Sequence, residues 1–214
     1  QEIFQLLSNP NVCNDNTMDF PGGYPGAPLP TRDPKTHVYD EVTSGDVWYD
    51  AHKTFNIQPN KEILIGIIGA LDKAVTDKYG KLCLEPFMFT LANILRLFRH
   101  QVAFWRIAGY LINQTLAEYK DSENKLQDYH DALKEVIHSF KALEAGKGIA
   151  WVFHYRGKSY PVILQFCLLL VVGDTVGHDN LCCQYGSRNK GCKCICRYCN
   201  IPTEESDNAE YKFT

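Results

Sequence analysis

The sequence predicts an α+β protein with a mixed sheet and helical cover. Two apolar runs rich in β-branched residues, Glu62–Leu71 (EILIGIIGAL) and Tyr160–Val172, have the character of buried strands. Between them, apolar residues recur at helical spacing from Leu126 to Leu143. Because strands and a long amphipathic helix alternate along one chain, a mixed sheet covered by helices is the natural architecture.

The composition is that of an ordinary globular chain. Its 214 residues are 45% hydrophobic and 22% charged, which is enough for one domain with a core, and the formal net charge of −3 gives no general attraction to nucleic acid. The longest apolar run, Pro161–Gly173, is too short to cross a bilayer, so we expect no membrane partner. The chain begins with Gln1 and shows no signal-peptide pattern, so we expect an internal fragment of an intracellular protein.

The remaining elements follow in order along the chain. Pro21–Pro34 is rich in Pro and Gly, and we expect residues 1–40 to form a flexible arm. Thr43–Ala51 places capping residues before an aromatic-rich run and predicts a short helix. Leu82–Leu95 is apolar but broken by a proline, and Trp105–Leu111 is a third strand candidate.

The second half of the chain contains the long helix and a hairpin. Gly146 supplies a C-cap for the helix. Ile149–Tyr155 and Tyr160–Val172 flank Arg156–Ser159, which is typical of a turn between two antiparallel strands.

Six of the nine cysteines crowd into Cys182–Cys199. We therefore expect a domain over residues 41–181 and a Cys-rich basic segment with an acidic tail over residues 182–214. Without a secretory signal, clustered cysteines favour a reducing compartment and a metal over disulfides. A Cys-x-x-Cys turn presents two thiolates to one Zn²⁺, and the alternative is a set of free thiols in a basic loop. The candidate zinc ligands are Cys192, Cys194, Cys196 and Cys199.

The same segment carries basic residues with no acid among them. Such a group would give salt-dependent, sequence-independent affinity for DNA phosphates. These DNA-binding candidates are Arg188, Lys190, Lys193 and Arg197. Three arginines near expected strand ends are weaker candidates, because arginine on a solvated face is the commoner case. They are Arg96, Arg99 and Arg106.

Two apolar strands end on an aspartate, one on Asp72 and the other, after Gly173, on Asp174. If these strands are neighbours, the two carboxylates converge at one edge of the sheet. Convergent carboxylates, with a third acid, can hold a pair of Mg²⁺ or Mn²⁺ ions for phosphodiester cleavage. The alternative is that aspartate is simply a common residue where a strand gives way to a turn.

Two blocks of the sequence resemble one family. Asp72–Pro86 (DKAVTDKYGKLCLEP), followed by Phe104–Tyr110 (FWRIAGY), resembles the first conserved block of Plavaka-like transposases, a branch of the CACTA and Kyakuja-Dileera-Zisupton transposons. Gly173–Cys182 (GDTVGHDNLC), with Cys196–Cys199, resembles the second block. The resemblance covers roughly Val42 to Asp207, and the paired blocks in order are more specific than either one alone.

The resemblance implies an RNase H-like fold with an acidic triad that cuts and joins DNA. Asp72 matches the first catalytic acid and Asp174 the second. The implied partners are transposon DNA ends, the implied cofactor is Mg²⁺ or Mn²⁺ with Zn²⁺ in the Cys-rich insertion, and the implied compartment is the nucleus. The sequence does not decide whether the chain forms a homo-oligomer.

This chain departs from the family pattern in three ways. Related sequences usually have threonine where Ala74 stands and an aromatic-Asn-Arg sequence near Ile94–Arg96. The third acid should lie downstream of the cysteines, beyond Thr214. We therefore expect a truncated RNase H-like domain that is incomplete as a catalyst. A different class stays open, a domesticated, non-catalytic, zinc-stabilised DNA- or protein-binding module. An unrelated α+β protein remains an alternative only if the two aspartate-ended strands are not adjacent.

Overall fold

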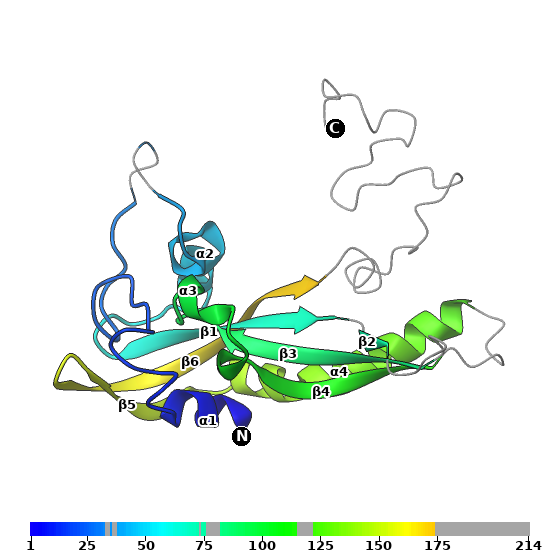
Figure 1. The fold of residues 1–214 in the computed structure, drawn as a ribbon. Coiled ribbons are helices and arrows are strands. Elements are labelled where there is room, and N and C mark those ends of the chain that lie inside the picture. The colour runs from blue at the N-terminus through cyan, green and yellow to red at the C-terminus, as the bar shows by residue number, and fades with distance from the viewer. Residues whose placement is uncertain (33–34, 36–37, 73, 76–81, 115–121, 174–214) are drawn as a thin grey trace.

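The computed structural model describes residues 1–173 except 33–34, 36–37, 73, 76–81 and 115–121 (Figure 1). Within this part of the chain, six strands form one mixed sheet, which confirms the predicted α+β class. The strands are β1 (Glu62–Leu71), β2 (Ala74–Val75), β3 (Leu82–Leu91), β4 (Arg106–Gln114), β5 (Ile149–Tyr155) and β6 (Lys158–Gly173). The helices are α1 (Glu2–Ser8), α2 (Asp46–Thr54), α3 (Arg96–Arg99) and α4 (Ser122–Glu144).

Strand β1 lies at the centre of the sheet. It pairs antiparallel with β3 on one side and parallel with β6 on the other. β6 pairs antiparallel with β5, which ends the strand order, and both β4 and the two-residue β2 pair with β3. Alternate residues of β1 point to opposite faces, as the pleat requires.

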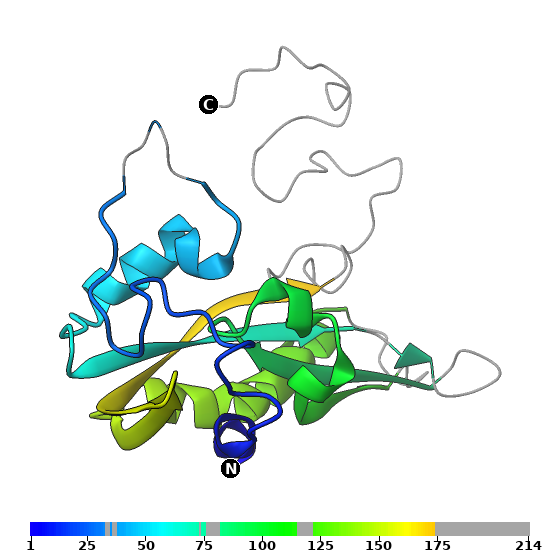
Figure 2. The ribbon, with the colours of Figure 1, turned by 60° about the vertical axis from the view of Figure 1, so that its left-hand side comes forward.

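The two faces of the sheet have different cover. α4 and α1 pack on one face, where they share a core with Ile65, Ile67 and Phe89. α2 packs on the other face, against Leu64 and Ile68. Figures 1 and 2 show α2 above the sheet, with α1 and α4 below it. A run that is nearly continuous in hydrophobicity, as in β1, is therefore explained by burial on both sides.

Gly66 allows α2 to approach the sheet closely. A Cβ atom at this position would lie 2.8 Å from the ring of Trp48 and 2.3 Å from Leu169 Cδ1. Trp48 is fully buried there, with Ala92 and Cys167 in the same cluster. The short helix expected near Thr43–Ala51 therefore forms, and its tryptophan covers the glycine of the central strand.

Residues 1–40 are not the arm that the Pro/Gly content predicted. α1 and the loop after it bury Leu6, Val12 and Phe20 in the main core. Farther along, the Tyr24 hydroxyl donates a hydrogen bond to Asn60 Oδ1 over 2.8 Å, and its ring stacks on Tyr160 at 5.6 Å. The Pro/Gly composition prevented helix or strand in residues 21–32 but did not prevent packing.

The expected break at Pro86 does not occur. β3 runs through this residue from Leu82 to Leu91. On one side of β3, pairing with β1 ends at Phe87, opposite Leu71, and pairing with β2 begins at Leu84, so Pro86 falls between these two ladders. On the other side Pro86 lies opposite Tyr110 in the β4 ladder. A residue that lacks a backbone N–H costs little at such an interruption.

Candidate functional site at the ends of β1 and β6

The two strands that end on aspartates are adjacent and parallel. Their register runs from Glu62 opposite Ile163 to Leu71 opposite Gly173, with a bulge after Ile67. Parallel neighbours lie roughly 4.8 Å apart and end at the same edge of the sheet. Figure 1 shows the arrowheads of β1 and β6 side by side. The unrelated α+β alternative required these strands to be apart and is therefore excluded.

Asp72 directly follows β1 and is exposed. Leu71 points into the core under α4, so the alternation of the strand turns Asp72 toward the opposite face. It forms no ion pair or hydrogen bond with any residue that the structure describes. Asp174 follows Gly173, the last residue of β6, and itself lies outside the described residues.

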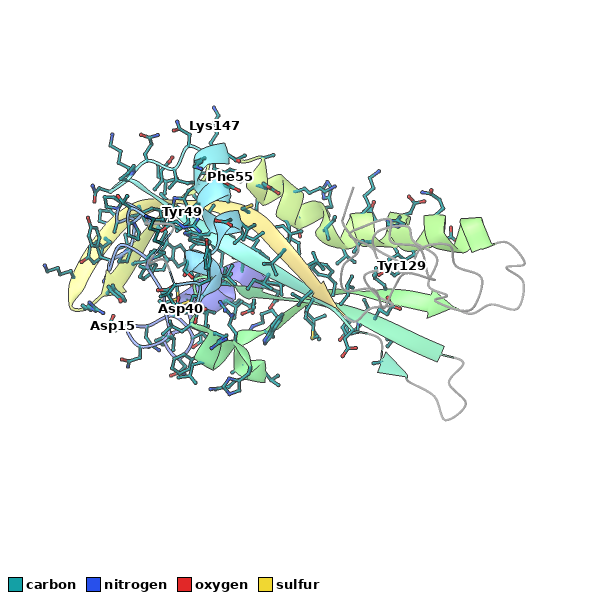
Figure 3. The ribbon with its side chains drawn as sticks, turned by 90° about the horizontal axis from the view of Figure 1, so that it is seen from above. Asp15, Asp40, Tyr49, Phe55, Tyr129 and Lys147 are labelled. Carbon is teal, nitrogen blue, oxygen red and sulfur yellow. The ribbon has the colours of Figure 1, made fainter. Side chains whose placement is uncertain are left out.

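No helix that the structure describes covers the face of the sheet around Asp72. α2 covers only the half of the sheet on which its Trp48 packs. On the other half, Tyr110 is 53% exposed, Ile107 45% and Val172 43%. On β4, Tyr110 lies opposite Pro86 and Ile107 opposite Met88, and these two β3 residues alternate with Phe87 and Phe89, which point into the core. On β6, Val172 lies opposite Ala70. All three exposed side chains therefore lie on the same face of the sheet as Asp72. In the view from above in Figure 3, Tyr49 of α2 and Phe55, directly after it, lie over one half of the sheet. Tyr129 of α4, which packs on the opposite face, lies at the other half.

The opposite face at this end carries a buried acid. Glu85 of β3 is only 4% exposed and lies on the α4 side of the sheet. Burial raises the pKa of the Tyr129 phenol on α4 well above its usual range, and the nearby Glu85 carboxylate raises it further. Sequence analysis did not single out Glu85, although an acid inside the apolar run LCLEPFMFTL was a visible signal. Its face directs it away from Asp72, toward the helix.

A buried asparagine fixes the strand that carries Asp72. The Asn93 side chain accepts a hydrogen bond from the Gly66 backbone N–H over 3.1 Å and donates one to the Leu64 carbonyl over 3.0 Å. It thereby extends the pairing of β1 beyond the end of β3 at Leu91. Sequence analysis missed this residue, since nothing in the local pattern distinguishes it from a turn asparagine.

The three arginines that were weaker phosphate candidates have different surroundings. The Arg99 side chain is largely buried, forms a 2.8 Å ion pair with Glu41 and donates to the carbonyls of Ala92 and Ile94. Arg106 donates to two backbone carbonyls near its own strand, and Arg96 is exposed. Arg99 thus has a structural role in holding the segment at Glu41 against α3.

The zinc and DNA-binding candidates lie outside the described residues. These are Cys192, Cys194, Cys196, Cys199, Arg188, Lys190, Lys193 and Arg197. Among the residues that are described, no group of three or more His, Cys, Asp or Glu side chains could hold a metal. In the same part of the chain, no helix has the length and apolar character to cross a membrane.

A comparison with known families decides the relationship that the two sequence blocks suggested. A model of the Plavaka transposase family matches residues 5–210 of the 214. The chain belongs to this family. Membership implies a transposase-type function and suggests DNA as the partner. No curated protein and no solved structure gives a significant match.

The family match includes the ends of β1 and β6. Asp72 and Asp174 both fall inside the range matched to the Plavaka transposases. So do the strands that carry them and the helices on both faces. The match also includes α1, apart from its first residues, and the loop after it, in agreement with the burial of this segment in the core.

Proposed function

We propose that this chain carries two acids of a transposase catalytic centre, Asp72 and Asp174, in an RNase H-like domain that cuts and joins DNA. The observation that supports the proposal most is the register of β1 and β6, which sets Leu71 opposite Gly173. The next residues in the chain are the two aspartates. Residues that follow paired positions on adjacent parallel strands can reach one ligand.

The strand arrangement supports the RNase H-like class. β1, β3 and β4 form an antiparallel meander, α4 follows, and the chain then enters the sheet again at β6, parallel to β1. β5 adds an antiparallel edge beyond β6. In this class the polar chemistry belongs at the end of the central parallel pair, which is where Asp72 lies.

The residues at this end fit a divalent cation of the Mg²⁺ type. Carboxylate oxygens are the ligands that Mg²⁺ and Mn²⁺ prefer, and Asp72 is exposed and without a cationic partner among the described residues. When bound, such ions activate a water or hydroxyl and stabilise the leaving oxygen of a phosphodiester. In our proposal Asp72 and Asp174 hold the ions, and the open face beside Tyr110 admits the DNA strand.

The C-terminal segment belongs to the same proposal. We assign the thiolates of the Cys-rich segment to a structural Zn²⁺ and its basic side chains to the DNA backbone. A reducing, nuclear location suits free thiolates and a DNA substrate. The zinc ligands in this proposal are Cys192, Cys194, Cys196 and Cys199, and the phosphate contacts are Arg188, Lys190, Lys193 and Arg197.

A second candidate function is a non-catalytic DNA- or protein-binding module that retains the fold and the zinc. Ala74, which is exposed in β2, favours it, because this position usually holds threonine in the resembling sequences. The two candidates differ in whether the aspartates bind a divalent cation.

The test is Mn²⁺ binding, measured by titration calorimetry on the 214-residue chain. Asp72→Asn and Asp174→Asn should each weaken Mn²⁺ binding by more than about tenfold, because each removes a direct ligand. The matched control is Asp128→Asn, an exposed acid on α4, on the other face of the sheet, which should leave the affinity unchanged. Zn²⁺ and DNA binding without any Mn²⁺ affinity would contradict the catalytic proposal and support the binding module.

A further inference from the structure

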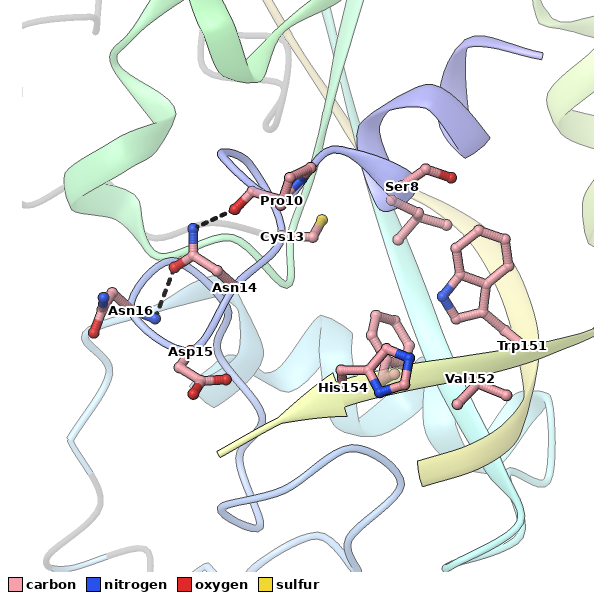
Figure 4. A pocket seen from close by; sticks show the side chains of 11 residues that line it. Ser8, Pro10, Cys13, Asn14, Asp15, Asn16, Trp151, Val152 and His154 are labelled. Atoms are coloured by element: carbon pink, nitrogen blue, oxygen red, sulfur yellow. Dashed lines mark hydrogen bonds between the residues drawn. The ribbon is translucent and has the colours of Figure 1, made fainter. Parts of the chain in front are cut away.

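A second polar site lies far from Asp72, at the free edge of the sheet. The cavity has a volume of about 620 Å³ and lies between the end of α1, the loop that follows it, and β5. β5 ends the strand order, so its outer edge has no strand partner within the described residues. The lining includes the side chains of Ser8, Asn14, Asp15, Asn16, Trp151 and His154 (Figure 4).

The loop that forms one wall is held by its own hydrogen bonds. Asn14 Nδ2 donates to the Pro10 carbonyl over 2.9 Å, and Asn14 Oδ1 accepts from the Asn16 backbone N–H over 2.9 Å. Asp15 Oδ1 accepts a 2.8 Å hydrogen bond from the backbone N–H of Arg156, at the tip of the β5–β6 hairpin. The wall is therefore fixed at both ends before any ligand arrives.

Several polar atoms of this cavity are not used by the fold. Trp151 packs against Phe4 at 6.2 Å between ring centroids, and its Nε1–H has no acceptor among the described residues. Figure 4 shows this nitrogen turned toward the space beside Cys13. Asp15 Oδ2 and His154 Nε2 are likewise without partners in that part of the chain, since each residue uses only its other polar atom. The cavity thus offers an indole ring, a donor and an acceptor within one space.

The charge around the cavity separates its inside from its rim. Asp15 places a carboxylate in the lining, which disfavours a phosphate inside. The hairpin tip next to Asp15 carries Arg156 and Lys158, both exposed. A ligand with a planar polar head and an anionic backbone matches this pattern, because the head can enter while the phosphates stay at the rim.

We propose that this cavity binds an unpaired nucleobase of a DNA strand, with Trp151 as the aromatic partner and Arg156 and Lys158 at the flanking phosphates. The proposal rests on the proposed function, which makes DNA the substrate, and adds a single-strand contact distant from Asp72. Base–aromatic stacking tolerates any base sequence, so the site selects unpaired DNA over duplex without reading its sequence.

The test compares two DNA forms with one variant. Binding of a short labelled single-stranded oligonucleotide and of the matching duplex to the 214-residue chain is measured by fluorescence anisotropy. Trp151→Leu retains an apolar contact with Phe4 but removes the ring, and it should weaken single-strand binding roughly tenfold. Duplex binding, which depends on phosphate contacts, should stay the same.

A second variant keeps the test independent of folding. His154 is exposed, and among the described residues it bonds only Ser159, over 3.0 Å. His154→Ala should therefore fold and should also weaken single-strand binding selectively. Equal loss of single-strand and duplex binding, or no loss in either variant, would overturn the cavity proposal and leave the Asp72 proposal standing. A chain that binds neither DNA form would contradict the proposed function as well.

Discussion

The half of the sheet under α2 and the half that ends at Asp72 are built from the same strands but have opposite surfaces. Under α2, Gly66 lets Trp48 seal the face, and Asn93 satisfies the backbone where the β3 pairing stops. At the other end, Tyr110 and Val172 are half exposed on the face of Asp72. One region is closed and hydrogen-bonded, and the other is open and carries an acid with no cationic partner among the described residues.

This difference indicates that the residues that stabilise the fold and the residues of the proposed cation site lie at different ends of β1. Substitutions in the closed half should change the free energy of unfolding and leave ion binding unchanged for the fraction that remains folded. Substitutions at the open end should do the reverse, because an exposed side chain contributes little to packing.

Trp48→Ala should have the largest effect on stability. Removing a fully buried indole from the α2 side of the sheet should cost about 3–5 kcal/mol of unfolding free energy, through lost burial and the cavity left over Gly66. Urea unfolding followed by circular dichroism measures it. Val47→Ala, at a 41% exposed position in the same helix, should cost less than about 0.5 kcal/mol. Similar costs for both variants would mean that α2 does not seal the sheet.

Asn93→Ala should follow in size. It leaves the Gly66 N–H and the Leu64 carbonyl without partners in a buried place, which should cost about 2–4 kcal/mol. Urea unfolding gives the stability, and hydrogen exchange of the Gly66 amide gives the local effect. A slow-exchanging Gly66 amide in this variant would show that another group satisfies it and would contradict the role assigned to Asn93.

His52 should make the closed half sensitive to acid. Burial next to Trp48 lowers the pKa of His52 from 6.5 to about 4, so the unfolded chain binds the proton first as the pH falls. Stability from this group is present above pH 6.5 and is lost as the pH falls toward 4. With its partial exposure discounted, the loss is about 1–2 kcal/mol.

The measurement is the unfolding free energy of the parent and of His52→Gln at pH 7 and at pH 4.5. The variant should lose less stability than the parent over this interval. His100→Gln, an exposed histidine after α3, serves as the control. An equal loss in parent and His52→Gln would refute the shifted titration.

Asp72→Asn should have the smallest effect on stability. An exposed residue after a strand end should change the unfolding free energy by less than about 0.5 kcal/mol, while Mn²⁺ binding is lost. Thermal or urea unfolding checks the first part. A destabilisation comparable to that of Trp48→Ala would place Asp72 among the structural residues and remove the contrast between the two halves.

The sequence predicted a strand correctly where both of its faces are buried, because such a strand is apolar along its whole length. β1 has the predicted bounds because every residue from Ile63 to Gly69 is buried, so the whole run is apolar. It did not predict that Leu6, Val12 and Phe20 join the core, because the Pro/Gly run after them suggested an arm for the entire segment. Nor did it predict that β3 passes Pro86, since the interruption of pairing that tolerates proline is a tertiary feature.

Some residues of the candidate site were likewise predicted from the sequence, and others were not. Asp72 and Asp174 were both singled out by their place after apolar strands, and the resemblance matched both to catalytic acids; their role stays a prediction. The adjacency of β1 and β6 depends on pairing between distant parts of the chain, which the local pattern of either strand does not encode. Asn93 and Glu85 were not predicted, because only the fold places an amide at the end of a ladder or an acid beneath a helix.

Anomalous scattering from Mn²⁺-soaked crystals tests most directly whether Asp72 and Asp174 share a divalent cation. We expect a manganese peak with a carboxylate oxygen of each aspartate at metal–oxygen distances of about 2.0–2.5 Å. Carboxylates that point apart, with no peak between them at saturating Mn²⁺, would contradict the catalytic proposal and leave a Plavaka-family domain that binds without cutting.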